Sequence, residues 1–127
     1  MAGVIRLDTH AVVWLYTGES ERFTKKGRAL LETEQLVVSP IVQLELAYLH
    51  EIERLKVGGA DIIGDLASRV GLTTSDQSLL SMVQAAAGLT WTRDPFDRLI
   101  VADALAANCT LLTKDASIRK HVLIARW

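Results

Sequence analysis

The sequence predicts an α/β fold in which a parallel β-sheet is covered by helices on both faces. Short runs of β-branched and apolar residues alternate with longer stretches whose apolar residues recur with helical spacing. Such alternation is typical of parallel sheets, because the crossover between two parallel strands usually contains a helix. A chain of 127 residues has the usual length of one domain, so we expect residues 1–127 to form a single domain.

The first half of the chain predicts two strands and three helices. VIRL at 4–7 predicts a short buried strand, and THAVVWLY, which follows Asp8, predicts a helix. TKKGRALLETE at 24–34 predicts a second, more polar helix, and LVVS at 36–39 predicts the second strand. The next helix begins with a Ser-Pro pair, in which the serine can cap the helix and the proline fits its first turn. Its apolar residues keep helical spacing as far as Leu55.

The second half of the chain predicts the remaining strands and helices. A Gly-Gly pair breaks the long helix, and ADIIGDLASRV predicts another one. GLTT at 71–74 is a weak, short strand, and the helix after it is expected to begin with a cap at Ser75 and to fade near Gly88. An Asp-Pro pair starts the next helix, which reaches about Ala107, and CTLLT at 109–113 predicts the fourth strand. The last elements are a short polar helix after Asp115 and a strand at 122–125.

Composition and charge restrict the class of protein and its partners. The 14 basic and 15 acidic side chains give a formal net charge of -1, so the chain lacks the basic excess that drives non-specific binding to nucleic acid. Cys109 is the single cysteine; it excludes an internal disulfide, fits a reducing compartment and has the apolar neighbours of an ordinary buried thiol. No apolar run approaches the length of a membrane span, and we expect a cytoplasmic protein.

Two acidic residues lie on helix faces that are otherwise apolar. At about 100° per residue, Glu45 falls inside an apolar stripe of its helix, and Asp97 falls in the same sector as Val101 and Ala104. We expect both faces to point inward, where an unpaired charge is costly and needs compensation. The stripe around Glu45 consists of Ile41, Leu44, Tyr48, Leu49, Ile52 and Leu55.

Two further aspartates, Asp8 and Asp115, directly follow predicted strands. In open α/β sheets ligands bind beyond the carboxyl ends of the strands, so these two can converge there with Glu45 and Asp97. Carboxylates about 5 Å apart repel by roughly 3 kcal/mol at an effective dielectric constant near 20, and four of them therefore need a counter-charge. Oxygen ligands favour Mg²⁺ or Mn²⁺, and the three scattered histidines form no zinc-binding pattern.

Each of these acids also has a structural interpretation. Asp8 and Asp115 can cap the helices that follow them. Asp97 can favour the helix dipole or complete a capping pair with Asp94, and Asp94 itself, which precedes a proline, is assigned to capping. Glu45 is too deep in its helix to act as a cap, which leaves an interhelical salt bridge as its structural alternative.

Other polar residues near these acids are ambiguous. Thr113, two residues before Asp115, can hydrogen-bond a carboxylate or a metal-bound water, and it is also an ordinary strand residue. Around its helix Asp103 falls between Phe96 and Leu99, a position that is ambiguous, and it is left outside the candidate site. Five basic residues that flank the acids can guide a phosphate backbone or can be solvated surface charge. They are Arg93, Arg98, Lys114, Arg119 and Lys120.

Four segments carry a pattern that is specific in combination: RLDTHAVVWL, SPIVQLELA, TRDPFDRLIVADALA and LLTKD, in this order. Together they resemble the PIN-domain family, in particular the VapC toxins of bacterial toxin-antitoxin pairs, over essentially the whole chain. The resemblance implies a three-layer domain with strand order 3-2-1-4-5, an Mg²⁺- or Mn²⁺-dependent ribonuclease, a homodimer and a small VapB-like antitoxin whose C-terminal segment occupies the active-site groove. It places the acidic centre on Asp8, Glu45, Asp97 and Asp115, and the family's Ser/Thr on Thr113.

The sequence therefore predicts metal-assisted hydrolysis of an RNA phosphodiester. In this hypothesis Asp8, Asp97 and Asp115 hold one or two ions, and Glu45 is a further ligand or the base that orients water. The alternative is a non-catalytic α/β module that binds RNA or protein and uses its acids structurally. A phosphatase with an aspartyl intermediate is disfavoured, because DTHAV lacks the second aspartate of the DxDxT signature. The sequence does not indicate which RNA is cut, and residues 56–74, the least family-like segment, are where we expect selectivity.

Overall fold

The computed structural model describes residues 3–127, and these contain one parallel β-sheet of five strands. The strands lie in the order β3-β2-β1-β4-β5, and every neighbouring pair is parallel. This is the order that the family resemblance implies, so the predicted fold class is confirmed. The strands are β1 (Val4–Leu7), β2 (Gln35–Val38), β3 (Thr73–Thr74), β4 (Thr110–Leu112) and β5 (Ala125–Arg126).

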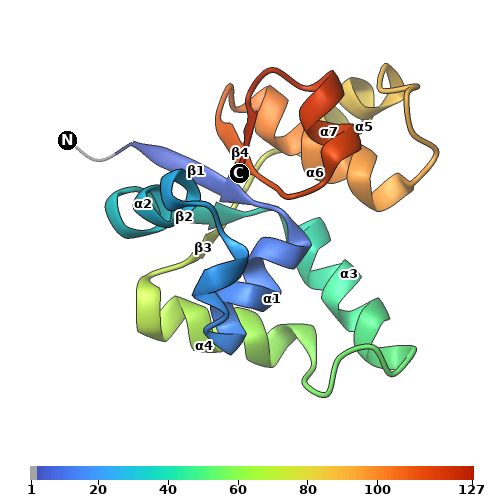
Figure 1. The fold of residues 1–127 in the computed structure, drawn as a ribbon. Helices are drawn as coiled ribbons and strands as arrows, with labels where there is room; N and C mark the ends of the chain where they lie inside the picture. Colours follow the sequence, from blue (N-terminus) through green and yellow to red (C-terminus); the bar gives the residue numbers. More distant parts are fainter. Residues whose placement is uncertain (1–2) are drawn as a thin grey trace.

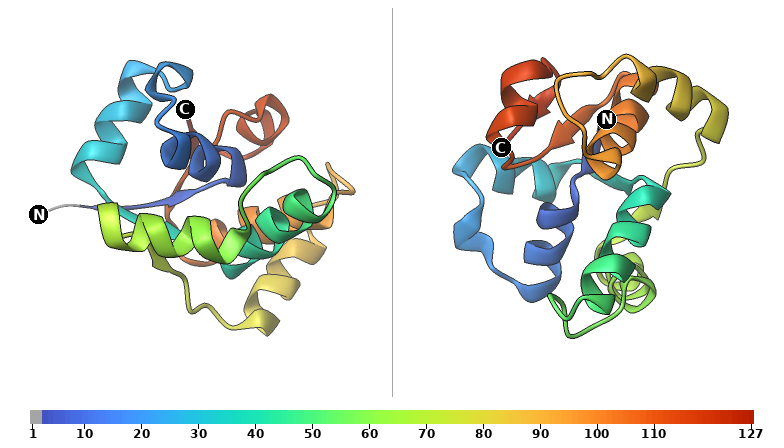
Figure 2. Two further views of the ribbon diagram at one scale, coloured as in Figure 1. Left: turned by 90° about the horizontal axis from the view of Figure 1, so that it is seen from below. Right: turned by 90° about the vertical axis from the view of Figure 1, so that its right-hand side faces the viewer.

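Helices cover both faces of the sheet and give three layers, with α1, α3 and α4 below the strands and α5, α6 and α7 above them in Figure 1. The change of face follows from right-handed crossovers, because the chain moves outward from β1 to β3 and then crosses back to β4. On the lower face α3 and α4 pack side by side (Figure 2). Within residues 3–127, no helix has the length and apolar character needed to cross a membrane. The helices are α1 (Thr9–Thr17), the 3₁₀ helix η1 (Ser20–Arg22), α2 (Lys25–Thr33), α3 (Pro40–Glu51), α4 (Gly59–Val70), α5 (Leu79–Ala87), α6 (Pro95–Ala106) and α7 (Ala116–His121).

The central strands form a buried platform. Leu7 on β1, Val38 on β2 and Leu111 on β4 are almost completely buried. Leu46 of α3 and Val101 of α6 are fully buried in the same core. Residues that follow these strands are therefore attached directly to the buried core.

The carboxyl ends of β1, β2 and β4 meet at one edge of the sheet. The Asp8 N–H donates to the carbonyl oxygen of Leu112 at 3.0 Å, which ties the end of β1 to the end of β4. Ser39, directly after β2, caps α3 by accepting a hydrogen bond from the Ile41 N–H. Asp8, Ser39 and Thr113 consequently lie along the same edge, although they are far apart in the sequence.

Close packing of α3 and α4 requires a glycine at position 59. A Cβ atom on Gly59 would lie 2.7 Å from the carbonyl oxygen of Gln43 and 3.0 Å from the Cβ of Leu46. The predicted Gly-Gly break is therefore also the contact that brings these two helices together.

The helix predicted to reach Leu55 is shorter than expected. It ends at Glu51, because Glu53 adopts a left-handed conformation with φ of 63°. The N–H groups of residues 54 and 55 turn back to the carbonyl oxygen of Leu49. Apolar spacing continues past the real end of the helix because the turn itself packs against the core.

Two other boundaries are wrong. The helix expected from Ser75 begins at Leu79, and Ser78 caps it. The strand expected at 122–125 is Ala125–Arg126, because the first residue of that run caps α7. The other predicted strands and helices are confirmed, with bounds that differ by no more than two residues.

The inward face predicted for α3 is only partly correct, because Ile41 packs against the core but several other members of the stripe do not. Leu44 and Tyr48 are 58% and 46% exposed, whereas Val42 and Leu46 are fully buried. A helical projection shows which residues share a face but not which face meets the core, and α3 is apolar on both sides. The partial burial of Glu45 must therefore come from its neighbours at the sheet edge.

Candidate active site

Asp8 is a buried carboxylate at the end of β1. Its Oδ1 accepts a hydrogen bond from the Thr9 N–H at 2.8 Å, and its Oδ2 accepts one from the Thr113 hydroxyl at 2.6 Å. The first bond caps α1, so the capping interpretation is correct. Burial raises the pKa of Asp8, although both hydrogen bonds and the nearby His10 oppose the rise. Asp8 is thus fixed in position but retains an unfavourable charge.

Glu45 projects from the second turn of α3 toward the start of α1. The Thr9 hydroxyl donates to Glu45 Oε1 at 2.5 Å, so the partner of Glu45 is a neutral hydroxyl rather than the cation of an interhelical salt bridge. Burial, and then the negative charges of Asp8 and Asp94, raise the pKa of Glu45. Sequence reasoning misses Thr9, although its place directly after Asp8, in the first turn of α1, is a usable signal.

Asp97 is the least compensated of the four acids. It is half-buried on the same side of α6 as buried residues, as predicted. The Asp94 carboxylate accepts hydrogen bonds from the N–H groups of Phe96 and Asp97, which confirms the capping role of Asp94. Partial burial and then neighbouring negative charge raise the pKa of Asp97 from 3.8 to about 7, and within residues 3–127 no hydrogen bond opposes this rise. The charges responsible belong to Asp94, Asp8, Asp115 and Glu45, in order of decreasing effect.

Asp115 lies at the exposed rim of this group. Its Oδ1 accepts a hydrogen bond from the Ile118 N–H at 2.9 Å, so Asp115 caps α7. The hydroxyl of the fully buried Thr113 accepts from the Asp115 N–H at 3.1 Å and donates to Asp8. Thr113 therefore links the two strand-end acids, and the Asp115 charge contributes to the raised pKa of Asp8 and Asp97.

The four predicted acids share one electrostatic environment but do not form a ready-made metal site. Among residues 3–127, no three Asp, Glu, His or Cys side chains are close enough to hold an ion as they stand. The donor set nevertheless fits a divalent cation in ligand type and in charge. All of its donors are oxygens, which suits Mg²⁺ or Mn²⁺. The pKa of Asp8, of Glu45 and of Asp97 is in each case raised in part by the negative charge of a neighbouring carboxylate.

A family model described as the PIN domain matches residues 5–122. The chain belongs to the PIN-domain family. This PIN domain is 29% identical over 123 residues to Ribonuclease VapC22 of Mycobacterium tuberculosis (strain ATCC 25618 / H37Rv), a match that covers 92% of this chain and 91% of that protein.

Two solved structures have the same fold. One is VapBC2 from Rickettsia felis bound to a DNA fragment from the promoter, with a TM-score of 0.67, 20% identity and 97% of each chain covered. The other is DNA-bound VapBC from Salmonella typhimurium, with a TM-score of 0.63, 19% identity and coverage of 99% of this chain and 96% of that one. At these identities the likeness concerns the fold.

The structure also gives Asp103 of this PIN domain a definite role. Asp103 is fully buried, and its Oδ2 lies 2.7 Å from Nε of Arg6 on β1. Its Oδ1 accepts a hydrogen bond from the Ser75 hydroxyl at 2.8 Å. The sequence leaves Asp103 ambiguous because its partner Arg6 is 97 residues away along the chain.

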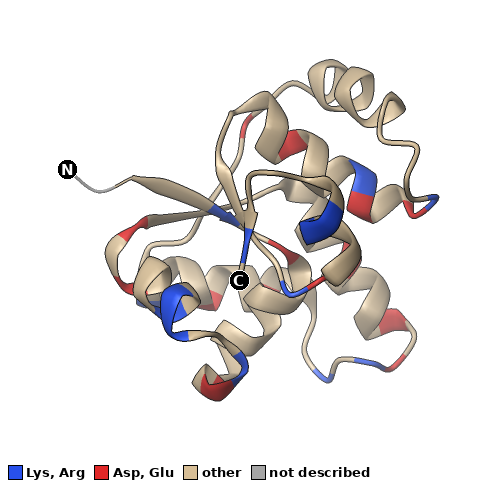
Figure 3. Ribbon diagram, turned by 45° about the horizontal axis from the view of Figure 1, so that its top comes forward, with Lys and Arg blue, Asp and Glu red and all other residues tan. Residues whose placement is uncertain are grey.

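Four of the five basic residues that flank the acids contact other parts of the protein. The guanidinium groups of Arg93, Arg98 and Arg119 each donate to a backbone carbonyl oxygen, and Lys114 Nζ lies 5.4 Å from the ring centroid of Trp14. Basic and acidic positions are interspersed along the ribbon (Figure 3). These contacts agree with surface charge and do not define one basic face for RNA.

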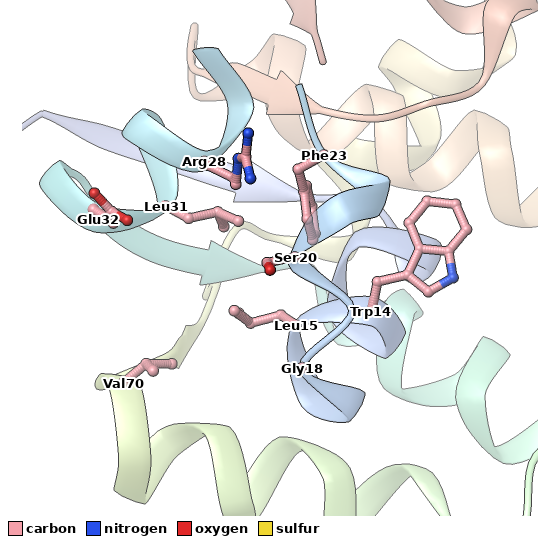
Figure 4. A pocket seen from close by; sticks show the side chains of 9 residues that line it. All are labelled: Trp14, Leu15, Gly18, Ser20, Phe23, Arg28, Leu31, Glu32 and Val70. Atoms are coloured by element: carbon pink, nitrogen blue, oxygen red, sulfur yellow. The ribbon is translucent and has the colours of Figure 1, made fainter. Parts of the chain in front are cut away.

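A mainly apolar hollow of about 360 Å³ lies beside α1, away from the acids. The indole of Trp14 and the ring of Phe23 stand at one side of it, and Arg28 and Glu32 of α2 stand at the other (Figure 4). None of the four candidate acids lines it. Its lining consists of Trp14, Leu15, Gly18, Ser20, Phe23, Arg28, Leu31, Glu32 and Val70.

Proposed function

We propose that this PIN domain is an Mg²⁺- or Mn²⁺-dependent endoribonuclease toxin that hydrolyses RNA phosphodiester bonds and is neutralised by a cognate VapB-like antitoxin. The observation that carries the proposal is Asp97, a half-buried carboxylate with acids around it, whose raised pKa is opposed by no hydrogen bond from residues 3–127. The relative named as a ribonuclease supports the reaction, and the neighbouring VapBC structures support the antitoxin.

The acidic centre is the proposed metal site. Asp8, Glu45, Asp97 and Asp115 would hold one or two ions, with Glu45 as a ligand or as the base. When bound, such an ion lowers the pKa of a water molecule and stabilises negative charge on the phosphate oxygens. It also supplies the counter-charge that these acids need.

The protein's own groups orient the reacting parts. Thr113 holds Asp8 through its hydroxyl and fixes the backbone of Asp115, and Thr9 holds Glu45. Because burial raises the pKa of Glu45, its carboxylate is a better proton acceptor near neutral pH. As the base, Glu45 would take a proton from the attacking water; the P–O3' bond breaks and the leaving 3'-oxygen takes a proton from solvent, so the products carry 5'-phosphate and 3'-hydroxyl ends.

Cleavage of RNA by the purified, antitoxin-free protein tests this reaction. We expect cleavage with Mg²⁺ or Mn²⁺, none with EDTA, and loss of cleavage in Asp8→Asn and Asp97→Asn. Glu51→Gln, which removes an exposed carboxylate at the end of α3, is the matched control and keeps the activity. Cleavage that ignores EDTA, or that persists at full rate in both aspartate variants, rejects the mechanism. Sequencing of the 5' ends identifies the RNA that is cut.

A non-catalytic binding module is the second candidate, because two of the four candidate acids, and Asp94 beside Asp97, cap helices. Asp8, Asp94 and Asp115 cap α1, α6 and α7 respectively, which is a structural use that needs no metal. Calorimetry with Mn²⁺ separates the two candidates. An absence of metal binding by the free protein would favour the module.

The hollow beside α1 is the proposed seat for an apolar segment of the antitoxin. Its lining combines the apolar Trp14, Phe23 and Leu31 with Arg28 and Glu32 at its rim. Since α1 begins beside Asp8, a peptide in this hollow can continue toward the acids. Leu31→Glu should weaken binding of the cognate antitoxin in calorimetry, and an unchanged dissociation constant would exclude this seat.

A homodimer is proposed from exposed apolar side chains on α3 and α5. Such side chains gather at protein interfaces, and sedimentation velocity should show a dimer that Leu80→Glu converts to monomers. A wild-type monomer would contradict this proposal. The exposed apolar residues are Leu44, Tyr48, Ile52, Leu79, Leu80 and Val83.

We also propose that the protein works as a single domain in the cytoplasm, where RNA is available and the Cys109 thiol stays reduced.

A further inference from the structure

Arg6, Ser75 and Asp103 form a closed hydrogen-bonded cluster behind the acidic centre. Arg6 Nε donates to Asp103 Oδ2 at 2.7 Å, and Arg6 Nη2 donates to the Ser75 hydroxyl oxygen at 3.2 Å. The Ser75 hydroxyl donates in turn to Asp103 Oδ1 at 2.8 Å. Each residue therefore contacts the other two, and we call these three residues the Arg6 cluster.

The Arg6 cluster joins three parts of the fold that carry or flank the candidate site. Arg6 is on β1, Ser75 directly follows β3, and Asp103 is on α6. Ser75 is also tied to β2, because its N–H donates to the carbonyl oxygen of Val38 at 2.7 Å. The cluster thus fastens α6 to the sheet through directional bonds as well as through apolar packing.

The position of the Arg6 cluster relates it to two of the acids. Arg6 precedes Asp8 by two residues, about 7 Å along β1, and these two side chains share a face of the strand. Asp103 follows Asp97 by six residues, about 9 Å along α6. Because α6 leads back across the sheet to β4, it runs antiparallel to β1. The step from Arg6 to Asp8 and the step from Asp103 to Asp97 therefore both lead from the Arg6 cluster toward the carboxyl edge of the sheet.

A buried ion pair is not the usual means of stabilising a fold. Arg6 and Asp103 are both buried, and well-packed apolar residues commonly replace such a pair without loss of stability. An Arg-carboxylate pair does add directional geometry, whereas apolar contact is non-directional. The geometry that it fixes is the register of α6 on the sheet.

We propose that Arg6, Ser75 and Asp103 are positioning residues that set the register of α6 against β1, and thereby hold Asp97 within electrostatic reach of Asp8. The consequence for metal binding and cleavage rests on the proposed function. The structural part, that the cluster places the first turn of α6, is independent of that function.

The test compares a charge-free variant, Arg6→Leu with Asp103→Leu, with the milder Ser75→Ala. The matched control is Arg22→Gln with Glu19→Gln, which removes an exposed ion pair at η1. Four measurements are made on each protein: urea unfolding, the amide NMR shifts of residues 96–98 in EDTA, Mn²⁺ affinity by calorimetry, and the kinetics of RNA cleavage as kcat and KM.

We expect the charge-free variant to stay folded and to show shifted amide signals for residues 96–98. Its Mn²⁺ affinity should weaken about tenfold, and kcat should fall about 100-fold, as a displacement of about 1 Å can cause, with a smaller change in KM. Ser75→Ala should show the same changes to a smaller degree, and the control should show none.

Unchanged amide signals of residues 96–98 in a folded charge-free variant would overturn the proposal, as would an unchanged Mn²⁺ affinity in a protein whose wild type binds Mn²⁺. If the charge-free variant does not fold, the amide signals of Ser75→Ala decide in the same way. A wild type that neither binds Mn²⁺ nor cuts RNA overturns the proposed function alone, because the amide signals still decide the role of the Arg6 cluster.

Discussion

Replacement of Asp97 by asparagine should stabilise the metal-free protein while it removes a candidate metal ligand. Asp97 is half-buried among acids and has a pKa raised from 3.8 to about 7. Asparagine has nearly the same shape and no charge, so the variant loses the repulsion and keeps the packing. A residue that only stabilises the fold would show the opposite effect.

The size of the effect follows from the pKa of Asp97. A rise from 3.8 to about 7 corresponds to about 4 kcal/mol at 1.36 kcal/mol for each pKa unit. Solvent screens part of this charge because the side chain is only half-buried, and we take about 2 kcal/mol. Since the folded state binds a proton between about pH 4 and pH 7 that the unfolded chain does not, this group makes the free energy of unfolding fall as pH rises through that window.

Urea unfolding in EDTA at low ionic strength measures this difference. At about pH 8 the Asp97→Asn protein should be more stable than wild type by about 2 kcal/mol, and near pH 4 the difference should vanish. Glu51→Gln serves as the control for removal of an exposed carboxylate and should follow wild type at both pH values. If wild type and Asp97→Asn have the same pH dependence, Asp97 does not carry the repulsion inferred from the structure.

Three further predictions address the metal, the hydroxyl at the site and the core. Mn²⁺ at about 100 times its Kd should raise the free energy of unfolding of wild type by about 2.7 kcal/mol and that of Asp97→Asn much less; equal shifts in urea midpoint would place the ion elsewhere. Thr113→Val removes the hydroxyl that lies 2.6 Å from Asp8 and should weaken Mn²⁺ binding about tenfold in calorimetry, whereas an unchanged Kd would make Thr113 a strand residue only. Leu46→Ala should lower the free energy of unfolding by about 2 to 5 kcal/mol, because Leu46 is fully buried; a loss below about 1 kcal/mol would contradict its place in the core.

Most of the secondary structure could be predicted from local sequence because local chemistry fixes it. Ser39 and Asp94 each precede a proline and each cap a helix, as expected from the residue types alone. A predicted helix boundary was wrong where a residue type that suits a helix cap has another role in the fold. Ser75 has the residue type of a cap, but it bonds Asp103 and Arg6, which lie far away in the sequence.

The sequence was a better guide to which residues belong to the candidate site than to how they are arranged. Strand ends place Asp8 and Asp115 at one edge, and the structure brings Glu45 and Asp97 within reach of their charges. The apolar stripe that contains Glu45 was nevertheless a poor guide to its orientation, because Leu44, Tyr48 and Ile52 of that stripe are exposed. Thr9 was missed because its hydroxyl becomes important only when α3 crosses the start of α1.

The sequence by itself determined the order of strands and helices along the chain, most of the helix caps and the list of candidate acids. These features depend on spacing and on residue type within a few positions. Tertiary structure alone decided which side of α3 is buried, that Thr9 and Thr113 orient Glu45 and Asp8, and that Arg6 pairs with Asp103. The physical reason is that burial, charge repulsion and hydrogen bonding depend on distances between residues that the chain keeps far apart. Packing of the helices on the sheet sets those distances.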